Sequence, residues 1–246
     1  MMVMKKKVRL DQLLAEQGLA ENNFQAQALI RLGRVLVDGE VVDKPGTLVL
    51  RESGIRIKEA LKYVSRGGLK LESALKELRV RVEDKVCLDV GASTGGFTDC
   101  LLQTGAGKVY ALDVGKGLID QKLRRDPRVI VIEKFNARYL SPKIIPEPIQ
   151  LATVDVSFIS LTLILPAVKT VLAKDAEVLA MVKPQFELSP KLARKGVVRD
   201  PELQMQAVEK VADFAQGMGF KIIGRAKAGI KGPKGNQEYF LYLING

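Results

Sequence analysis

The fold is decided by the stretch Val86-Cys87-Leu88-Asp89-Val90-Gly91-Ala92-Ser93-Thr94-Gly95-Gly96-Phe97. Its first five residues form a mainly apolar run that predicts a strand buried on both faces of a sheet. The glycines predict a loop whose backbone amides face a ligand, and a helix from Phe97 adds an N-terminus that favours negative charge. Their spacing differs from the Gly-x-Gly-x-x-Gly of dinucleotide-binding loops. The stretch therefore predicts the first strand, binding loop and helix of an α/β domain.

Strands and helices alternate along the rest of this domain. Helices are predicted at 69–78, 97–103, 161–172 and 201–218, and strands at 86–90, 108–113, 129–132, 151–156, 177–182, 220–223 and 239–244. Continuous apolar strands between helices indicate a doubly wound, mostly parallel sheet covered on both faces. A loop joins the last two strands, so we expect them to be antiparallel.

A smaller α+β unit precedes this domain. Leu10, Leu13 and Leu14 have helical spacing before Gly18, and Asn22 or Asn23 can cap a second helix that ends at Gly33. Two strands are predicted around the Asp-Gly turn at 38–39, and a further strand at 47–57. We therefore expect a small domain at 1–62, a linker at 63–68 that contains Gly67-Gly68, and the α/β domain at 69–246.

Composition limits the function classes. The 39 Lys and Arg outnumber the 28 Asp and Glu, a net charge of +11 that favours a polyanionic partner. The absence of histidine excludes a histidine base, and with two cysteines no zinc site is expected. The most apolar stretch, 159–173, contains Pro166 and Lys169 and is too short to span a bilayer. We expect a soluble, cytoplasmic protein without a metal.

A cofactor site is predicted around the glycine loop. A loop of this shape suits the methionine part of S-adenosylmethionine, and Asp113, which ends the second strand, suits the ribose hydroxyls of an adenosine group. Asn136 follows the third strand, where the adenine edge would be read. The candidate cofactor-binding residues are Gly91, Ala92, Ser93, Thr94, Gly95, Gly96, Phe97, Asp113, Asn136 and Asp155.

Four charged residues stand next to apolar elements. Asp155 and Lys183 end two strands, Glu238 precedes the last strand, and Lys70 lies on the helix before the sheet. A charge directly after a buried strand is costly unless it is paired, and doubly wound sheets bind ligands at the carboxyl ends of their strands. We therefore expect these four side chains to converge.

At these residues the chain resembles the ribose 2′-O-methyltransferases of the FtsJ type, whose hallmark is a Lys-Asp-Lys-Glu tetrad. More narrowly, it is similar to the TlyA family. The matching segments are 65–71, 89–97, 155–160, 183–187, 196–200 and 232–240. The resemblance implies a Rossmann-like class I methyltransferase fold, S-adenosylmethionine as the cofactor, and methylation of cytidine riboses in ribosomal RNA or ribosomal subunits.

The N-terminal domain resembles the alpha-L RNA-binding domain of a small-subunit ribosomal protein. The match includes Gly18-Leu19, Leu29-Ile30, 37–39 and 44–46. Asn22-Asn23 stands where this family has Ser-Arg, so a phosphate-binding arginine is missing. The candidate RNA-binding residues are Arg9, Arg31, Arg34 and Arg66.

Within the tetrad, Lys183 is the candidate base, and Asp155 and Glu238 would orient the two amines. Three other functions compete with this interpretation. A non-catalytic ribosome-binding protein would keep the fold without turnover. A membrane-lytic role follows from the haemolysin label given to some family members, and the composition does not support it. A nicotinamide-dependent dehydrogenase is disfavoured by the loop spacing and the missing histidine.

Overall fold

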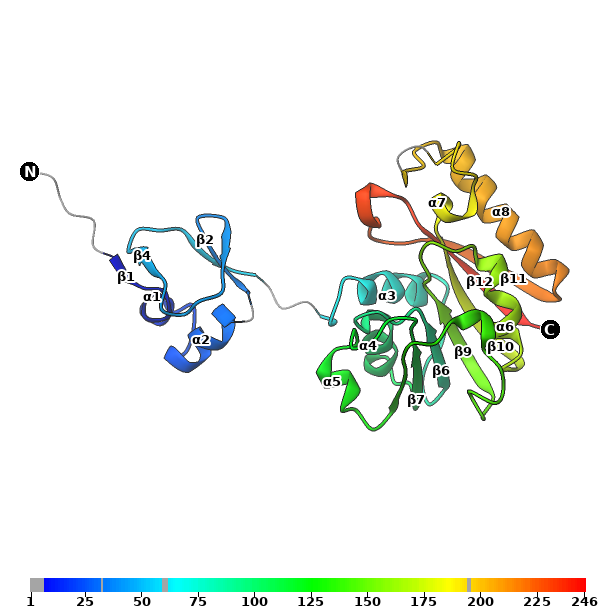
Figure 1. Cartoon of the computed structure of the whole chain (residues 1–246), viewed down its shortest axis with the longest axis horizontal. Helices are drawn as coiled ribbons and strands as arrows, with labels where there is room; N and C mark the ends of the chain where they lie inside the picture. The colour runs from blue at the N-terminus through cyan, green and yellow to red at the C-terminus, as the bar shows by residue number, and fades with distance from the viewer. Residues whose placement is uncertain (1–6, 32, 59–61, 194–195) are drawn as a thin grey trace, which may run out of the picture. The chain divides into compact units, whose positions relative to one another are not determined.

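The structure, a computed structural model, describes residues 7–31, 33–58, 62–193 and 196–246 (Figure 1). Its contacts divide the chain into two compact units, residues 1–60 and 61–246. The first unit has one apolar core and the second has two. Each unit therefore buries its own apolar surface.

The N-terminal unit combines two helices with two antiparallel sheets. β1 (Lys7–Arg9) pairs with β4 (Leu48–Leu50), and β2 (Val35–Val37) lies between β3 (Glu40–Val42) and β5 (Ile55–Ile57). The helices are α1 (Leu10–Glu16) and α2 (Asn23–Arg31). Asn22 caps α2 as predicted, because its Oδ1 accepts the Gln25 N–H at 2.9 Å.

The single strand predicted at 47–57 is wrong. It is divided into β4 and β5, which belong to different sheets. A turn separates them, in which the Ser53 N–H donates to the Leu50 carbonyl at 3.0 Å. Arg51-Glu52-Ser53-Gly54 interrupts the apolar pattern and ends in a Ser-Gly pair that is typical of turns, a signal that the prediction overlooked.

The larger unit is built on a seven-stranded sheet with the order β11-β12-β10-β9-β6-β7-β8. The strands are β6 (Val86–Val90), β7 (Lys108–Leu112), β8 (Val129–Ile132), β9 (Ile149–Val154), β10 (Leu172–Val182), β11 (Phe220–Lys227) and β12 (Tyr239–Asn245). β6 to β10 are mutually parallel, and β12 runs antiparallel to both β10 and β11. The predicted α/β fold is confirmed, and so is the antiparallel arrangement of the last two strands.

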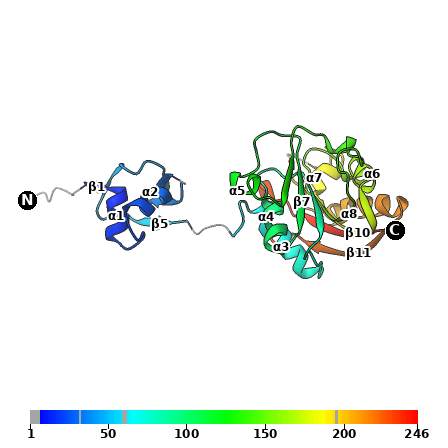
Figure 2. The same ribbon diagram turned by 90° about the horizontal axis from the view of Figure 1, so that it is seen from below.

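Helices cover both faces of this sheet. α3 (Gly67–Glu77) and α4 (Gly96–Gln103) pack on the core around Cys87 and Phe240, and lie together in Figure 2. α6 (Leu165–Lys169) and α8 (Pro201–Gly217) pack on the other core, around Leu88 and Leu241. Shorter helical turns are α5 (Gln121–Arg124), α7 (Pro184–Glu187), η1 (Ala137–Tyr139), η2 (Leu161–Leu163) and η4 (Pro233–Gly235).

The helix predicted at 161–172 is also wrong. The segment holds η2, then α6, and then the start of β10 at Leu172. Pro166 lies in the first turn of α6, where a missing N–H is tolerated, and so begins a second helix. None of the helices in the described ranges is long and apolar enough to cross a membrane.

Residues 63–66, where we expected a linker, pack within the larger unit. The Tyr63 side chain is buried against the core that contains Phe97. The Val64 N–H donates to Asp99 Oδ2 at 2.8 Å, and Gly67 already begins α3. This packing holds the start of α3 beside α4.

Candidate active site

The glycine loop is shaped by close backbone contacts. Gly91 has φ of +85°, and a Cβ at this position would lie 2.3 Å from the carbonyl oxygen of Asp155. Gly95, with φ of +94°, precedes α4, and a Cβ there would meet Leu123 Cδ1 at 2.2 Å. Only glycine fits these two positions, and the loop is held against the end of β9.

Asp113 holds the same loop from the neighbouring strand. Its Oδ2 accepts the Ser93 N–H and its Oδ1 accepts the Gly115 N–H, both at 2.7 Å. A carboxylate oxygen can accept more than one hydrogen bond, so Asp113 keeps acceptor capacity for ligand hydroxyls. The carboxylate lines a cavity of about 420 Å³ whose other residues include Val114, Leu118, Phe135 and Asn136. Asn136 Oδ1 itself accepts the Arg138 N–H at 3.1 Å.

A larger cavity of about 750 Å³ contains all four charged residues of the predicted tetrad. Lys70 Nζ donates to Glu238 Oε2 at 2.5 Å, and Lys183 Nζ lies 2.6 Å from Asp155 Oδ1. The Lys183 and Glu238 side chains are 10% and 1% exposed, so these are largely buried pairs. Removal of one partner would leave a buried charge uncompensated.

The topology explains why residues so distant in sequence meet here. Asp155 and Lys183 follow the carboxyl ends of the adjacent parallel strands β9 and β10. β12 is antiparallel to β10, with Val182 opposite Tyr239, so the beginning of β12 lies at the same edge of the sheet. Glu238, which directly precedes β12, therefore lies at the same edge of the sheet as Lys183. Lys70 is contributed by α3.

The two cavities adjoin each other. Gly91, Ser93, Asp155, Ser157 and Phe158 line both. The remaining predicted loop residues Ala92, Thr94, Gly96 and Phe97 line the larger cavity, as does Arg66. Gly95 is the exception among the loop residues, because it packs on Leu123 and is not part of either lining.

Three side chains at this site were not predicted from the sequence. Ser157 Oγ accepts a hydrogen bond from Lys183 Nζ at 2.9 Å and thereby orients the amine. Gln185 lines the larger cavity with its Oε1 buried and, within the described residues, without a hydrogen-bond partner. Phe158 is 90% exposed and contacts Phe186 with ring centroids 5.0 Å apart. Phe158 could have been selected from the sequence, because it is an aromatic residue that closely follows the charged end of a strand at Asp155.

α7, which carries Gln185 and Phe186, is firmly held. Glu187 is 5% exposed, and its carboxylate accepts the Leu161 N–H at 2.8 Å and the Ser160 hydroxyl at 2.5 Å. Lys210 Nζ donates to the Glu187 carbonyl at 2.6 Å. The one-turn helix thus presents its two side chains to the cavity from a fixed position.

Asp89 is a further unpredicted polar residue, buried in β6 beneath the loop. Thr98 Oγ1 donates to its Oδ2 at 2.7 Å and Thr153 Oγ1 to its Oδ1 at 3.2 Å. Burial raises the pKa of Asp89 to about 7; the Thr98 hydrogen bond opposes this shift, and the nearby Asp155 carboxylate adds to it. The carboxyl group therefore titrates near neutral pH.

The predicted RNA-binding arginines of the N-terminal unit form a partly connected group. Arg9 pairs with Asp11 through Nη2 at 2.7 Å, and Gln27 Nε2 donates to the same carboxylate at 3.1 Å. Arg31 Nη2 donates to Gln27 Oε1 at 3.3 Å. Arg34 Nη2 instead donates to the Lys58 carbonyl at 2.8 Å. Arg9 and Arg31 thus share one network, which does not include Arg34.

Comparisons with known proteins agree with this architecture. The family model described as FtsJ-like methyltransferase matches residues 63–244, and that described as S4 domain matches residues 8–55. At the level of the fold alone, the chain resembles a SAM-dependent methyltransferase from Aquifex aeolicus, with 18% identity and a TM-score of 0.52 over 74% of this chain and 95% of that one.

Two relatives match nearly the whole chain. A structure from Streptococcus thermophilus, provisionally named a hemolysin, is 43% identical with a TM-score of 0.75 and covers 98% of this chain and 89% of its own. The 16S/23S rRNA (cytidine-2′-O)-methyltransferase TlyA of Mycobacterium tuberculosis is 42% identical over 98% of this chain and 91% of its own length. The chain therefore belongs to the TlyA-like family of rRNA methyltransferases, in which an S4 domain precedes an FtsJ-like methyltransferase domain.

Proposed function

We propose that this protein transfers a methyl group from S-adenosylmethionine to the 2′-hydroxyl of a cytidine in ribosomal RNA, free or within a subunit. The observation that carries the proposal is the pairing of Lys70 with Glu238 and of Lys183 with Asp155 in one cavity beside the glycine loop. The TlyA relative, which covers nearly the whole chain, supports ribosomal RNA and cytidine as the substrate.

The residues around the loop fit the cofactor. The lack of a side chain at Gly91 lets the loop lie against Asp155, and residues 91–94 of this loop line the larger cavity. Asp113 would accept hydrogen bonds from the ribose hydroxyls, and the apolar residues of the smaller cavity, with Asn136, would hold the adenine. When bound, S-adenosylmethionine supplies an electrophilic methyl group.

The four charged residues would act on the ribose hydroxyl. Lys183 in its uncharged form accepts the hydroxyl proton at Nζ, and Asp155 at 2.6 Å stabilises the ammonium that results. Ser157 fixes the direction of the Lys183 amine. Lys70, held by Glu238, positions the nucleotide and offsets the negative charge that develops on the oxygen.

We assign a separate role to each of the two units. The domain at 1–62 would bind RNA through Arg9, Arg31 and Arg34, and Arg66, which directly precedes α3 of the methyltransferase domain, would contact RNA at the larger cavity. The net charge of +11 favours such a partner.

The test is transfer of labelled methyl groups to ribosomal RNA and to isolated subunits by the wild type and Lys183→Met. Loss of the base should lower the rate about 10²- to 10⁴-fold, while calorimetry should give an unchanged cofactor affinity. Lys174→Met, a change at an exposed lysine of β10, is the matched control. If the wild type binds both cofactor and RNA without transfer, the protein is a non-catalytic RNA-binding protein instead.

A further inference from the structure

α2 of the N-terminal unit presents an aromatic residue and a cation on one face. Ala26 and Ile30 are buried in the core of this unit, whereas the Phe24 side chain is 83% exposed and Arg31 is exposed. Residues three and seven positions apart lie on the same side of a helix, so Phe24, Gln27 and Arg31 form one stripe. The stripe thus exposes an aromatic face and a guanidinium group on the same side of one helix, the two kinds of group that bind bases and phosphates of single-stranded nucleic acid.

Arg31, on the same helix face as Phe24, is positioned by a hydrogen bond and is not neutralised by any carboxylate that the structure describes, whereas Arg9 is paired with Asp11. Arg31 donates to the neutral amide of Gln27 at 3.3 Å, and no carboxylate pairs with it in the described part of the chain. Gln27 is fixed in turn by Asp11, which also holds Arg9. The Arg9 side chain remains 48% exposed although it is paired. The surface therefore offers the guanidinium group of Arg31, which has no ion-pair partner among the described residues, on the same helix face as the Phe24 ring.

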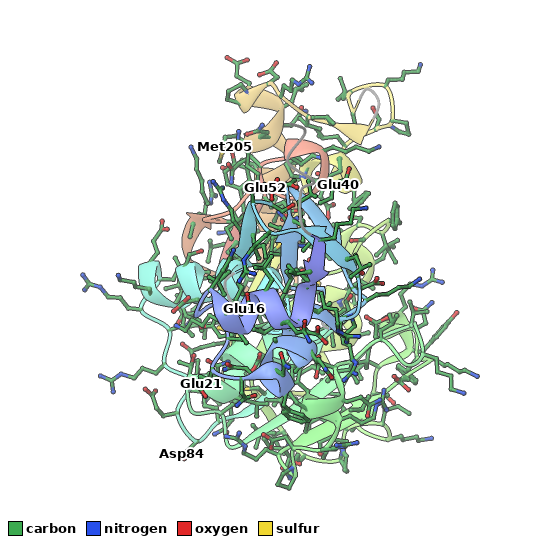
Figure 3. All side chains as sticks on the ribbon, turned by 90° about the vertical axis from the view of Figure 1, so that its left-hand side faces the viewer. Glu16, Glu21, Glu40, Glu52, Asp84 and Met205 are labelled. Carbon is green, nitrogen blue, oxygen red and sulfur yellow. The ribbon has the colours of Figure 1, made fainter. Side chains whose placement is uncertain are left out.

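The acidic residues Glu16 and Glu21 precede this stripe in the sequence. Figure 3 labels Glu16 and Glu21, which stand at the end of α1 and in the loop before α2. Glu16 is paired with Arg51, whereas Glu21 is three residues from Phe24 and ten residues from Arg31 along the sequence. A phosphate is consequently favoured near Arg31, and an uncharged planar group near Phe24.

We propose that this face of α2 binds an unpaired RNA nucleotide, whose base stacks on the Phe24 ring while a neighbouring phosphate contacts Arg31. The inference deepens the proposed RNA-binding role of this unit and rests on it. Proteins bind unpaired bases by stacking on exposed aromatic rings and bind the backbone with arginine. A paired base has no free face to offer, so the surface should prefer single-stranded over duplex RNA.

The full-length chain allows a direct test, because it contains no tryptophan. Phe24→Trp creates a single fluorophore, and its emission should be quenched when a single-stranded RNA oligonucleotide stacks on it. Phe24→Ala and Phe24→Leu should both bind this RNA roughly tenfold more weakly than the wild type, whereas Phe24→Trp should retain the affinity. Leu48→Ala, at another exposed apolar residue of the same unit, is the matched control and should bind normally.

Salt dependence separates stacking from phosphate contacts. Phe24→Ala should leave the slope of log Kd against log salt unchanged, whereas Arg31→Ala should reduce it by about one. Wild-type affinity in Phe24→Leu, unquenched Phe24→Trp, equal binding of duplex and single strand by all variants, or no RNA binding by the wild type would each overturn the inference. Methyl transfer is measured separately, so its absence together with Phe24-dependent RNA binding would refute the proposed enzyme but not this surface.

Discussion

Asp89 shows how a single side chain can link the core to the site. It lies within β6, two residues before Gly91, and its carboxyl group is held by Thr98 of α4 and Thr153 of β9. The carboxyl therefore ties together the three elements that surround the glycine loop. Because burial raises its pKa to about 7, the folded protein retains a proton there that the unfolded chain releases near pH 3.8.

This difference predicts a stability that depends on pH. Between about pH 4 and pH 7 the folded state binds more protons at Asp89 than the unfolded state, so the free energy of unfolding should decrease as the pH rises through this window. The decrease should be on the order of a few kcal/mol, and Asp89→Asn should largely remove it. Urea unfolding of both proteins at several pH values from 5 to 8 measures the effect.

Asp126→Asn provides the control, because the Arg128 hydrogen bond lowers the pKa of Asp126. The stabilisation from Asp126 is lost only as the pH falls below its ordinary range, so this variant should keep the wild-type slope above pH 5. A constant difference between wild type and Asp89→Asn at every pH would contradict the raised pKa.

At the scale of single residues, the sequence was enough to select the four charged residues of the site, but not to predict which of them pair with each other. Lys70, Asp155, Lys183 and Glu238 could be selected because each stands at the border of an apolar run, where a charge is costly. The specific pairs could not be predicted, because the pairing of Lys70 with Glu238 depends on the position of β12 in the sheet.

At the scale of elements, the loop between β6 and α4 depends on contacts that glycine alone permits. Its backbone passes so close to β9 that a methyl group on Gly91 would overlap the Asp155 carbonyl. The long apolar strands and the glycine loop could be predicted because their patterns are continuous. α7 could not be predicted, because a helix of a single turn is too short to show a helical period of apolar residues. Gln185 and Phe186 were therefore missed as residues of the site.

Gly91→Ala should weaken binding of S-adenosylmethionine roughly tenfold or more, about 1.4 kcal/mol, because the loop must move away from β9. Gly18→Ala is a matched control, since Gly18 also has a positive φ, +69°, but a Cβ there meets nothing within 4 Å. Calorimetry on both variants measures the affinities. Similar affinities in the two variants would show that the close approach to Asp155 does not shape the binding loop.

At the scale of the whole molecule, the two units have separate apolar cores and are expected to unfold separately. The proposed cofactor contacts only the larger unit. S-adenosylmethionine at about 100 times its Kd should therefore stabilise that unit by about 2.7 kcal/mol and leave the smaller unit unchanged.

Differential scanning calorimetry with and without the ligand should show one transition that moves up by several degrees and one that stays in place. At the same concentration, tenfold weaker binding by Gly91→Ala should reduce the stabilisation to about 1.4 kcal/mol, so its transition should move up by about half as much. A shift of both transitions, or of neither, would contradict the assignment of the ligand to the larger unit.

The position of β12 in the sheet has a consequence for the timing of synthesis. Both of its neighbours, β10 and β11, precede it along the chain, so their facing edges stay unpaired until residues 239–245 have been made. Glu238 arrives with that strand. The carboxylate partner of Lys70 is therefore synthesised after the glycine loop and after both lysines, and the Lys70–Glu238 pair can form only once β12 has joined β10 and β11.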